Sequence, residues 1–196
     1  IGVGVTTKQV ATNFLTVITQ SSAEAAIAIG SVSTLTAGNL YSISSLSDLN
    51  KLASLVNSGQ ASNCTFILTG DIDMANSPGY IPIGTDEHKF MGTFYGNGHV
   101  ISNVSISQSG TSGVGILGVT GNTARILDLG VENATVSGKD YTGVIVGNSA
   151  GTITNCYVKG NVNVNGNSYV GAITGQATNT IASSYTSGNI NINGSG

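Results

Sequence analysis

The residues able to do acid–base or metal chemistry are few and gather near the middle of this sequence. Asp71 and Asp73 stand two positions apart, so on one strand both carboxylates would point the same way. Such a pair can bind a cation or supply the two acids of glycoside hydrolysis. A hard cation takes about six or more oxygen ligands, however, and few others stand near this pair. Asp71 and Asp73 are therefore weak metal candidates, and hydrogen bonding at a corner is the favoured interpretation.

A second polar cluster lies at residues 85–89 and contains Asp86, Glu87 and His88. Loops often carry function. No further ligand stands at the spacing of a metal motif, however. A solvated turn is therefore the favoured interpretation of this cluster.

The last third of the chain has almost no charge, because Lys159 is the only charged side chain between residues 141 and 196. This stretch therefore lacks the paired acids of a hydrolase and the base of a lyase. We predict a non-enzymatic protein with no catalytic or cofactor-binding residues. The alternative is a carbohydrate-binding or carbohydrate-cleaving protein that uses Asp71, Asp73 and the 85–89 loop.

The chain segments that would position these polar residues belong to a protein built from sequence repeats. Residues 141–168 and 169–194 have nearly the same sequence, and matching residues such as Tyr141 and Tyr169 stand 28 positions apart. A fixed period of about 20 to 50 residues is typical of a solenoid. Leucine-rich repeats share this period, but their fixed Leu and Asn pattern is missing.

Within each repeat, short β-branched residues alternate with Asn, Ser or Thr, most plainly at 161–165 and 189–193. Period two is typical of a strand with one face inward. Each repeat is too small to bury its own apolar face, so neighbouring repeats must cover it as parallel strands about 4.8 Å apart. The sequence therefore predicts an all-β protein, a right-handed parallel β-helix. Its predicted inward columns are Val136, Val164 and Ile192, and Ala134, Val162 and Ile190; the outward column is Thr135, Asn163 and Asn191.

The repeats extend backwards less regularly, because turns absorb insertions. Their spacing aligns Ile101 with Ile126, Ile153 and Ile181. Cys64 lies before the first aligned repeat and Cys156 lies about three repeats later, at roughly 4.8 Å per repeat. That separation exceeds the Cα limit of about 7 Å for a disulfide. Both cysteines are therefore predicted to be buried thiols.

Residues 45–58 predict a short amphipathic helix. Ser45 with Asp48 three positions later resembles a capping box, an apolar stripe follows, and Gly59 provides a stop. A helix over the first coil would protect the open end of a β-helix from pairing with other chains. We therefore expect residues 41–196 to form the β-helix, with this helix as its N-terminal cap.

Residues 1–40 lack the repeat and mix helical spacing with strand-like runs, so we predict a separate extension of mixed structure for assembly or capping. At the other end, no polar coil follows Ile190 and Ile192. We therefore expect either further coils or a cover from another subunit. Residues 1–40 of a neighbour are the candidate cover, in a head-to-tail contact that propagates as a filament, sheath or surface layer.

Composition narrows the class of protein. Only 8% of the 196 residues are charged and the formal net charge is −3, so no basic surface for nucleic acid is expected. No apolar run reaches the roughly 18 residues of a membrane span. Low charge with abundant Asn, Thr, Ser and Gly is typical of secreted surface proteins, so we predict an extracellular location.

The glycosylation candidates are the sequons at Asn63, Asn103, Asn133 and Asn193.

Several motifs follow one another in a fixed order. They are Phe66-x-Leu-x-x-Asp-Ile-Asp73, Pro82-Ile-Gly-Thr85, Gly92-Thr-Phe-x-Gly-Asn-Gly-x-x-Ile-Ser-Asn103 and Gly151-x-Ile-x-Asn-Cys-Tyr-x-x-Gly-Asn-Val162. With the preceding helix, this order resembles the GLUG-motif repeat family of bacterial and archaeal surface proteins over residues 41–196. The chain departs from that family at Gly143-Val-Ile-Val-Gly147, which has one extra residue between the glycines.

The resemblance implies an adhesin-like β-helical surface protein of structural function. Its implied partners are copies of itself, other cell-surface components or glycans. The family offers no catalytic or cofactor-binding residues to carry over to this chain.

Overall fold

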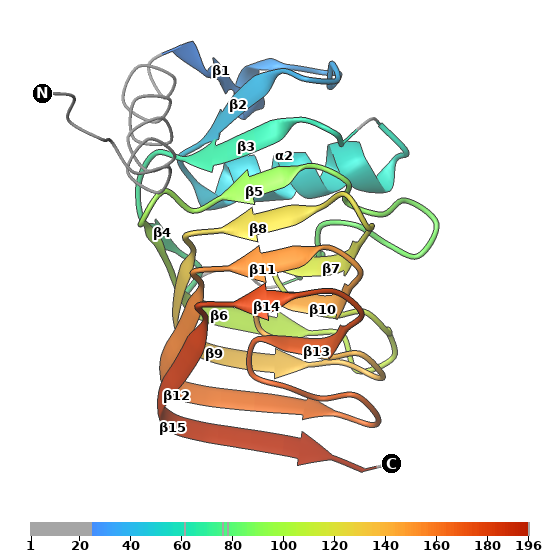
Figure 1. Cartoon of the computed structure of the whole chain (residues 1–196), viewed down its shortest axis with the longest axis vertical. Coiled ribbons are helices and arrows are strands. Elements are labelled where there is room, and N and C mark those ends of the chain that lie inside the picture. Colours follow the sequence, from blue (N-terminus) through green and yellow to red (C-terminus); the bar gives the residue numbers. More distant parts are fainter. Residues whose placement is uncertain (1–24, 61, 76, 78, 196) are drawn as a thin grey trace, which may run out of the picture.

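The strands of the chain form three parallel sheets, which we call sheets A, B and C (Figure 1). The computed structural model describes residues 25–60, 62–75, 77 and 79–195. Sheet A contains β1 (Ile27–Ala28), β2 (Leu40–Ile43), β3 (Thr65–Leu68), β5 (Thr93–Tyr95), β8 (Arg125–Leu127), β11 (Thr152–Thr154) and β14 (Ile181–Ala182). Sheet B contains β4 (Ile72–Asp73), β6 (Val100–Ser107), β9 (Gly130–Ser137), β12 (Tyr157–Gly166) and β15 (Tyr185–Gly194). Sheet C contains β7 (Leu117–Thr120), β10 (Val146–Ser149) and β13 (Thr174–Ala177).

The chain visits the three sheets in a repeating order, A then B then C, as in β8, β9 and β10 or β11, β12 and β13. Each visit adds one strand below the last, which gives a parallel β-solenoid of about 5 turns. We call residues 167–194 the last coil and residues 139–166 the penultimate coil. This architecture confirms the predicted all-β parallel β-helix.

The register of the two final strands of sheet B is the predicted one. Val162 pairs with Ala134 on one side and with Ile190 on the other, and Val164 pairs with Ile192. Val162 and Val164 are fully buried, which confirms that the alternating positions face inward. The coils therefore bury valine and isoleucine inside and present asparagine outside.

The predicted register of Ile101 is wrong. Ile101 pairs with Val131, whereas Ile126 pairs with Phe94 and Ile153. The error is understandable because the apolar spacing of β6 occurs twice in the next coil, five residues apart, so the pattern alone cannot choose between the two registers. The hydrogen-bonded ladder of sheet B selects the later one.

The predicted helix is α2 (Leu46–Asn57), between β2 and β3. The Ser45 hydroxyl accepts a hydrogen bond from the Asp48 backbone N–H at 3.2 Å, and the Asp48 carboxylate accepts one from the Ser44 N–H at 2.8 Å. This is a capping arrangement shifted by one residue from the standard box. The side chains that α2 buries against the core are Leu49, Leu52, Ala53, Leu55 and Val56.

The N-terminal extension predicted over residues 1–40 is described from residue 25 onward. Its β1 extends sheet A by pairing with β2, and the 3-10 helix η1 (Ile29–Ser31) follows β1 directly. Ile29 is fully buried in the same core as α2. This part of the extension therefore packs on the solenoid; residues 1–24 lie outside the described part.

The types of side chain that fill the interior differ along the solenoid axis. In the upper coils, which are those nearest α2, aromatic rings fill the interior. Tyr41 stacks on Phe66 with 5.7 Å between ring centroids, and Phe66 lies against Phe90 with 5.6 Å between ring centroids. In the lower coils the interior is filled by valine and isoleucine. Cys64 and Cys156 are both buried, as predicted, and they are not joined by a disulfide.

Glycines occupy positions around β10 because the backbones of neighbouring coils come close together there. A Cβ on Gly143 would lie 2.3 Å from the Val146 carbonyl oxygen and 2.6 Å from Thr174 Cα. A Cβ on Gly147 would lie 2.3 Å from the Val114 nitrogen. Only glycine lets the backbones come this close.

The corners between sheets A and B use a left-handed backbone conformation, which asparagine and aspartate tolerate better than most residues. The Asn155 side-chain amide donates a hydrogen bond to the Asp128 carboxylate of the coil above. The corner residues with positive φ are Asn97, Asp128, Asn155 and Ser183.

Candidate functional site

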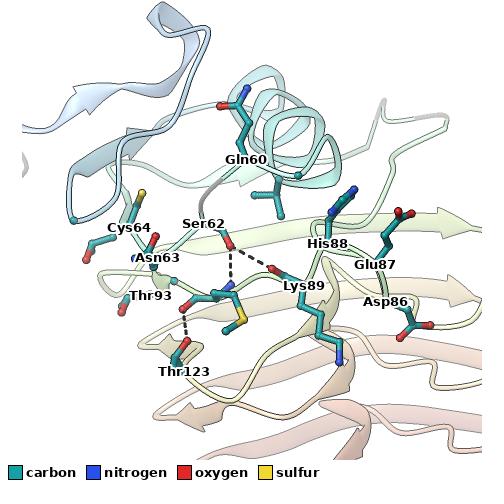
Figure 2. Close-up of a pocket in the computed structure, with 16 residues that line it drawn as sticks. Gln60, Ser62, Asn63, Cys64, Asp86, Glu87, His88, Lys89, Thr93 and Thr123 are labelled. Carbon is teal, nitrogen blue, oxygen red and sulfur yellow. Dashed lines mark hydrogen bonds between the residues drawn. The ribbon is translucent and has the colours of Figure 1, made fainter.

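A cleft of about 800 Å³ opens where the end of α2 meets the 85–89 loop (Figure 2). Three hydrogen bonds hold the segment behind this loop in place. The Ser62 hydroxyl accepts from the Met91 N–H at 2.9 Å and lies 3.3 Å from the Lys89 carbonyl oxygen, and the Thr123 hydroxyl donates to the Met91 carbonyl at 2.9 Å. Other lining residues are Gln60, Asn63, Cys64, Thr65, Asp86, Glu87, His88 and Thr93.

The charged residues of the loop do not converge on one point of this cleft. Asp86 and Glu87 are exposed, and Figure 2 shows them on the opposite side of the view from Asn63 and Cys64. The His88 ring packs on the backbone of Gly59, where an added Cβ would lie 3.0 Å from His88 Cε1. The arrangement therefore provides polar groups around a concave surface rather than two carboxyl groups facing one bond.

Cys64 lines the cleft but is a poor nucleophile in this setting. Its sulfur donates to the Thr36 carbonyl oxygen at 3.2 Å. Burial raises the pKa of the Cys64 thiol above its ordinary value. Since the thiolate is the reactive form, burial suppresses the chemistry that this sulfur could do.

Asp71 and Asp73 lie away from the cleft. Thr65, at the start of β3, lines the cleft, while both aspartates follow the far end of that strand. In Figure 1, β4 lies beside the left ends of the sheet A strands, and the green loop that follows β4 in sequence lies beside their right ends. The structure therefore places the two halves of the predicted carbohydrate site, the aspartate pair and the 85–89 loop, at opposite ends of the sheet A strands.

Each of the two aspartates is hydrogen-bonded to the coil below. Asp71 Oδ1 accepts from the Val100 N–H at 2.9 Å and lies 3.2 Å from His99 Nδ1; the Val100 bond, followed by the smaller His99 contacts, lowers the pKa of Asp71. Asp73 Oδ1 accepts from the Asn103 side-chain amide at 3.0 Å, and this bond chiefly lowers the pKa of Asp73. These are the contacts of a corner that joins two coils. Over the described part of the chain, no group of three or more His, Cys, Asp or Glu side chains could hold a metal ion.

The outer face of sheet B carries ladders of side chains that run along the solenoid axis. The Asn191 amide donates to Asn163 Oδ1 at 3.1 Å, and the Asn193 amide donates to Asn165 Oδ1 at 2.9 Å. The first of these ladders, between Asn163 and Asn191, lies in the outward column that the sequence predicts. Where these ladders lie, the face is polar and uncharged.

Two stacks of tyrosines accompany the amide ladders, and the sequence analysis did not predict them. Tyr157 stacks on Tyr185 at 5.5 Å, and Tyr141 stacks on Tyr169 at 4.9 Å between ring centroids. The signal was present, because tyrosines one repeat apart in a parallel solenoid must lie one above the other. Beside the first stack, Lys159 Nζ bonds Glu132 Oε1 at 2.9 Å and lies 5.2 Å from the Tyr157 ring centroid.

The four sequons occupy different settings. Asn103 and Asn133 line a shallow groove of about 480 Å³ on the face of sheet B, and their side chains bond Asp73 and the Asn161 N–H, respectively. The Asn193 amide is part of a ladder, and Asn63 lines the cleft. Glycosylation at these positions stays a prediction.

The chain is similar in sequence to two curated proteins. It is 38% identical over 138 residues to halomucin of Haloquadratum walsbyi, covering 65% of this chain and 2% of halomucin. It is 31% identical over 102 residues to a protein of Evansella cellulosilytica provisionally named a Gly-rich membrane protein, covering 48% of this chain and 12% of that protein. The chain thus spans a small part of the length of either relative. No family model matches it.

One solved structure shares the fold. It is a protein of Bacteroides ovatus provisionally named an immunoglobulin A1 protease, with a TM-score of 0.53 and 22% sequence identity, covering 76% of this chain and 48% of that one. At this identity the likeness supports the solenoid fold alone. Together with the fold, the two sequence relatives fit a surface repeat protein. No helix within the described ranges is long and apolar enough to cross a membrane.

Proposed function

We propose that this chain is a structural segment of an extracellular surface protein, with an adhesin-type role and no enzymatic activity. The observation that carries the proposal is the outer face of sheet B. There, uncharged amides are hydrogen-bonded from coil to coil, as in the pair of Asn163 and Asn191, in place of convergent ionised groups. Such a face gives a stiff, soluble rod, which suits a segment that holds other parts of a protein away from a surface.

Further support comes from the names of the relatives and from the motif order. One relative is named a Gly-rich membrane protein and the other halomucin, and each is far longer than the aligned segment. The motifs between Phe66 and Val162 follow the order of the GLUG-motif repeat proteins, which favours membership of that family of surface proteins.

The non-enzymatic part of the proposal rests on the geometry of the acids. Asp71 and Asp73 bond the coil below, and they are separated from Asp86 and Glu87 by the length of a sheet A strand. Glycoside hydrolysis needs two carboxyl groups roughly 5 to 9.5 Å apart across one cleft. The Asp71 and Asp73 carboxylates instead act as hydrogen-bond acceptors within the wall of the solenoid.

The location can be tested with antibodies raised against the purified chain. We expect them to label intact cells of the producing organism, and brief protease treatment of whole cells should remove the label. Antibodies against a cytoplasmic protein provide the control for cell integrity. Labelling that requires permeabilised cells would contradict an extracellular role.

A carbohydrate-binding or carbohydrate-cleaving function is the second candidate, and the cleft favours it. Asn63, Thr93 and Thr123 offer neutral hydrogen-bonding groups around a volume of about 800 Å³. The test is release of reducing ends from a panel of neutral and acidic polysaccharides, with Glu87→Gln and His88→Ala as the variants. Activity that both variants abolish would favour the enzyme and overturn the structural proposal. Absence of activity in the unaltered chain is the result we expect.

A further inference from the structure

Two tyrosines at the turns from sheet B to sheet C have an unfavourable backbone conformation. Tyr141 and Tyr169 both have a φ of 56°, whereas the other non-glycine residues with positive φ in the described part of the chain are asparagine, aspartate or serine. Bulky side chains rarely occupy this region, because the Cβ comes too close to the following carbonyl oxygen. One coil above, the corresponding residue is Gly113, with a φ of 73°. Strain of this kind, at positions where glycine would be relaxed, indicates a role for the tyrosine side chain.

The rings of these two tyrosines lie one above the other. Their centroids are 4.9 Å apart and the angle between the ring planes is 15°. The backbone fixes this arrangement, because the Tyr141 N–H donates to the Ser168 carbonyl oxygen and the Thr142 N–H donates to the Tyr169 carbonyl oxygen, each at 3.0 Å. Tyr141 is half-buried, so part of it is open to solvent. Since the contact lies between two coils, a further coil beneath the last one would leave it in place.

Two phenols held in this way are suited to oxidative coupling. A one-electron oxidant converts a tyrosine into a phenoxyl radical by removing an electron, while the hydroxyl proton passes to water. The unpaired electron is shared between the oxygen and the neighbouring Cε atoms of the ring. A second radical that is already in contact reacts there, because fixed proximity replaces a diffusional encounter.

We propose that Tyr141 and Tyr169 form an oxidative cross-linking site, at which a dityrosine bond joins the penultimate coil to the last coil. Each ring loses one electron and its hydroxyl proton, and the two radicals form one C–C bond between Cε atoms. The hydrogens on those two carbons leave as protons while both oxygens are protonated again. The oxidant is hydrogen peroxide acting through a peroxidase, and one peroxide accepts the two electrons and two protons to give two water molecules.

The bond would act on the fold as a disulfide does. It joins residues that stand 28 positions apart, so it closes a loop of that length and restricts the unfolded chain. The cross-linked coils would then separate only if a covalent bond broke. This inference does not depend on the proposed function.

The other pair of stacked tyrosines is less suited to this reaction and provides a comparison within the same molecule. The rings of Tyr157 and Tyr185 are 5.5 Å apart, and Lys159 Nζ lies 5.2 Å from the centroid of the Tyr157 ring. A nearby positive charge opposes the removal of an electron from the ring. Glu132 holds this charge in place, because its Oε1 atom lies 2.9 Å from Lys159 Nζ. We therefore expect coupling at Tyr141 and Tyr169 first.

The test is treatment of the dilute, purified 196-residue chain with peroxidase and hydrogen peroxide. Dityrosine is measured by its fluorescence in the monomer band of a denaturing gel. We expect a fluorescent monomer that migrates ahead of the untreated 19.6 kDa chain, because the closed loop makes the denatured chain more compact. Trypsin digestion alone does not identify the pair, because Lys159 is the only trypsin site between residues 141 and 196 and either bond would join the same two peptides.

Substitutions identify the pair. Tyr141→Phe keeps the ring but has no hydroxyl group to oxidise, so it should lower the dityrosine fluorescence of the monomer by at least about 10-fold. Tyr157→Phe is the matched control, because it removes one hydroxyl group from the other stack, and it should leave the signal close to that of the unaltered chain. Tyr141→Asn suits the positive φ, so it should fold and also lack the signal. Circular dichroism checks that each variant is folded.

Several results would overturn the proposal. One is the absence of dityrosine from the treated chain. Another is dityrosine found only in species of twice the chain mass, because the coupled rings would then belong to separate molecules. A signal that Tyr157→Phe lowers as much as Tyr141→Phe does, or more, would also contradict the assignment to Tyr141 and Tyr169.

Discussion

The upper and lower coils of this solenoid share the strands of sheet A but place their stacked aromatic rings on opposite sides of the wall. In the upper coils the stacked rings of Tyr41, Phe66 and Phe90 are inside, in the same buried core as the apolar face of α2. In the lower coils the interior holds aliphatic side chains and Cys156 but no aromatic ring, and the stacked rings of Tyr157 and Tyr185 lie on the outside.

This difference shows that the coils with the most regular sequence repeat are not the coils that we expect to contribute most to stability. The 28-residue repeat is most evident in the lower coils, where outward tyrosines and asparagines must match from one coil to the next. The upper coils repeat less closely because bulky interior rings and a helix fill the space in ways that differ from coil to coil. Burial of large apolar surface contributes far more to folding than an exposed stack does. We therefore expect the less regular region to be the more stable one.

Removing an interior ring should have the largest effect. Phe66 is 0% exposed and contacts rings on both sides, so Phe66→Ala should lower the free energy of unfolding by roughly 3 to 5 kcal/mol through lost burial and a cavity. Urea denaturation followed by circular dichroism measures this. Ser105→Ala on the exposed face of β6 is the control and should change stability by less than about 0.5 kcal/mol. A loss below about 1 kcal/mol for Phe66→Ala would mean that the interior rings do not support the upper coils.

Adding a single methyl group between the lower coils should have the next largest effect. The Cβ of Gly143→Ala would lie within 2.7 Å of three backbone atoms, so the coils must move apart. We expect a loss of about 3 kcal/mol in the same urea experiment. Gly110→Ala is a matched control, because its Cβ would meet nothing within 4 Å. Equal stability of the two variants would show that the coils can separate at little cost.

Local patterns predicted a large part of this fold. The alternation at residues 161–165 identified the inward and outward positions of β12, because period two is a property of any strand. Ser45 and Asp48 identified the start of α2, because capping involves only a few adjacent residues. Both predictions depend on interactions within one element, which a single sequence can show.

Predictions that required two distant segments to be placed together were less successful. The register of Ile101 was wrong because two spacings in the next coil match β6 equally well, and the pairing of β6 with β9 selects the later one. For a related reason, the sequence did not show that Asp73 and the 85–89 loop lie apart. The sequence shows that both are polar, but the direction of β3 determines that they lie at opposite ends of sheet A.

Removing an exterior ring should be less costly than removing an interior one. Tyr157→Ala breaks the stack with Tyr185 and the contact with Lys159, and such pairs contribute about 0.5 to 1.5 kcal/mol beyond their burial. We expect a loss of about 1 kcal/mol by urea denaturation. Tyr157→Phe keeps the ring and should stay close to the unaltered chain. A loss as large as that of Phe66→Ala would contradict the distinction between the two regions.

The smallest expected effect on stability concerns Asp71, whose carboxylate joins two upper coils on the outer surface of the solenoid. Its pKa is lowered mainly because the Val100 N–H donates to the carboxylate, so the folded state favours the ionised form. The resulting stability is fully present above the unfolded pKa of about 3.9 and is lost as the pH falls through the lower folded value. Because Asp71 is largely exposed to solvent, the contribution is small.

The measurement is the difference in urea midpoint between the unaltered chain and Asp71→Asn at a series of pH values. We expect the unaltered chain to be slightly more stable at neutral pH and the difference to shrink as the solution is acidified below about pH 4. His99→Ala should retain most of this pH dependence, because the backbone bond from Val100 is the larger cause. If His99→Ala removed the pH dependence as fully as Asp71→Asn does, the histidine rather than the backbone of the next coil would be the main partner of this carboxylate. The upper coils would then be joined on the outside by an ion pair, like Lys159 and Glu132 in the lower coils, and the two regions would differ only in their interiors.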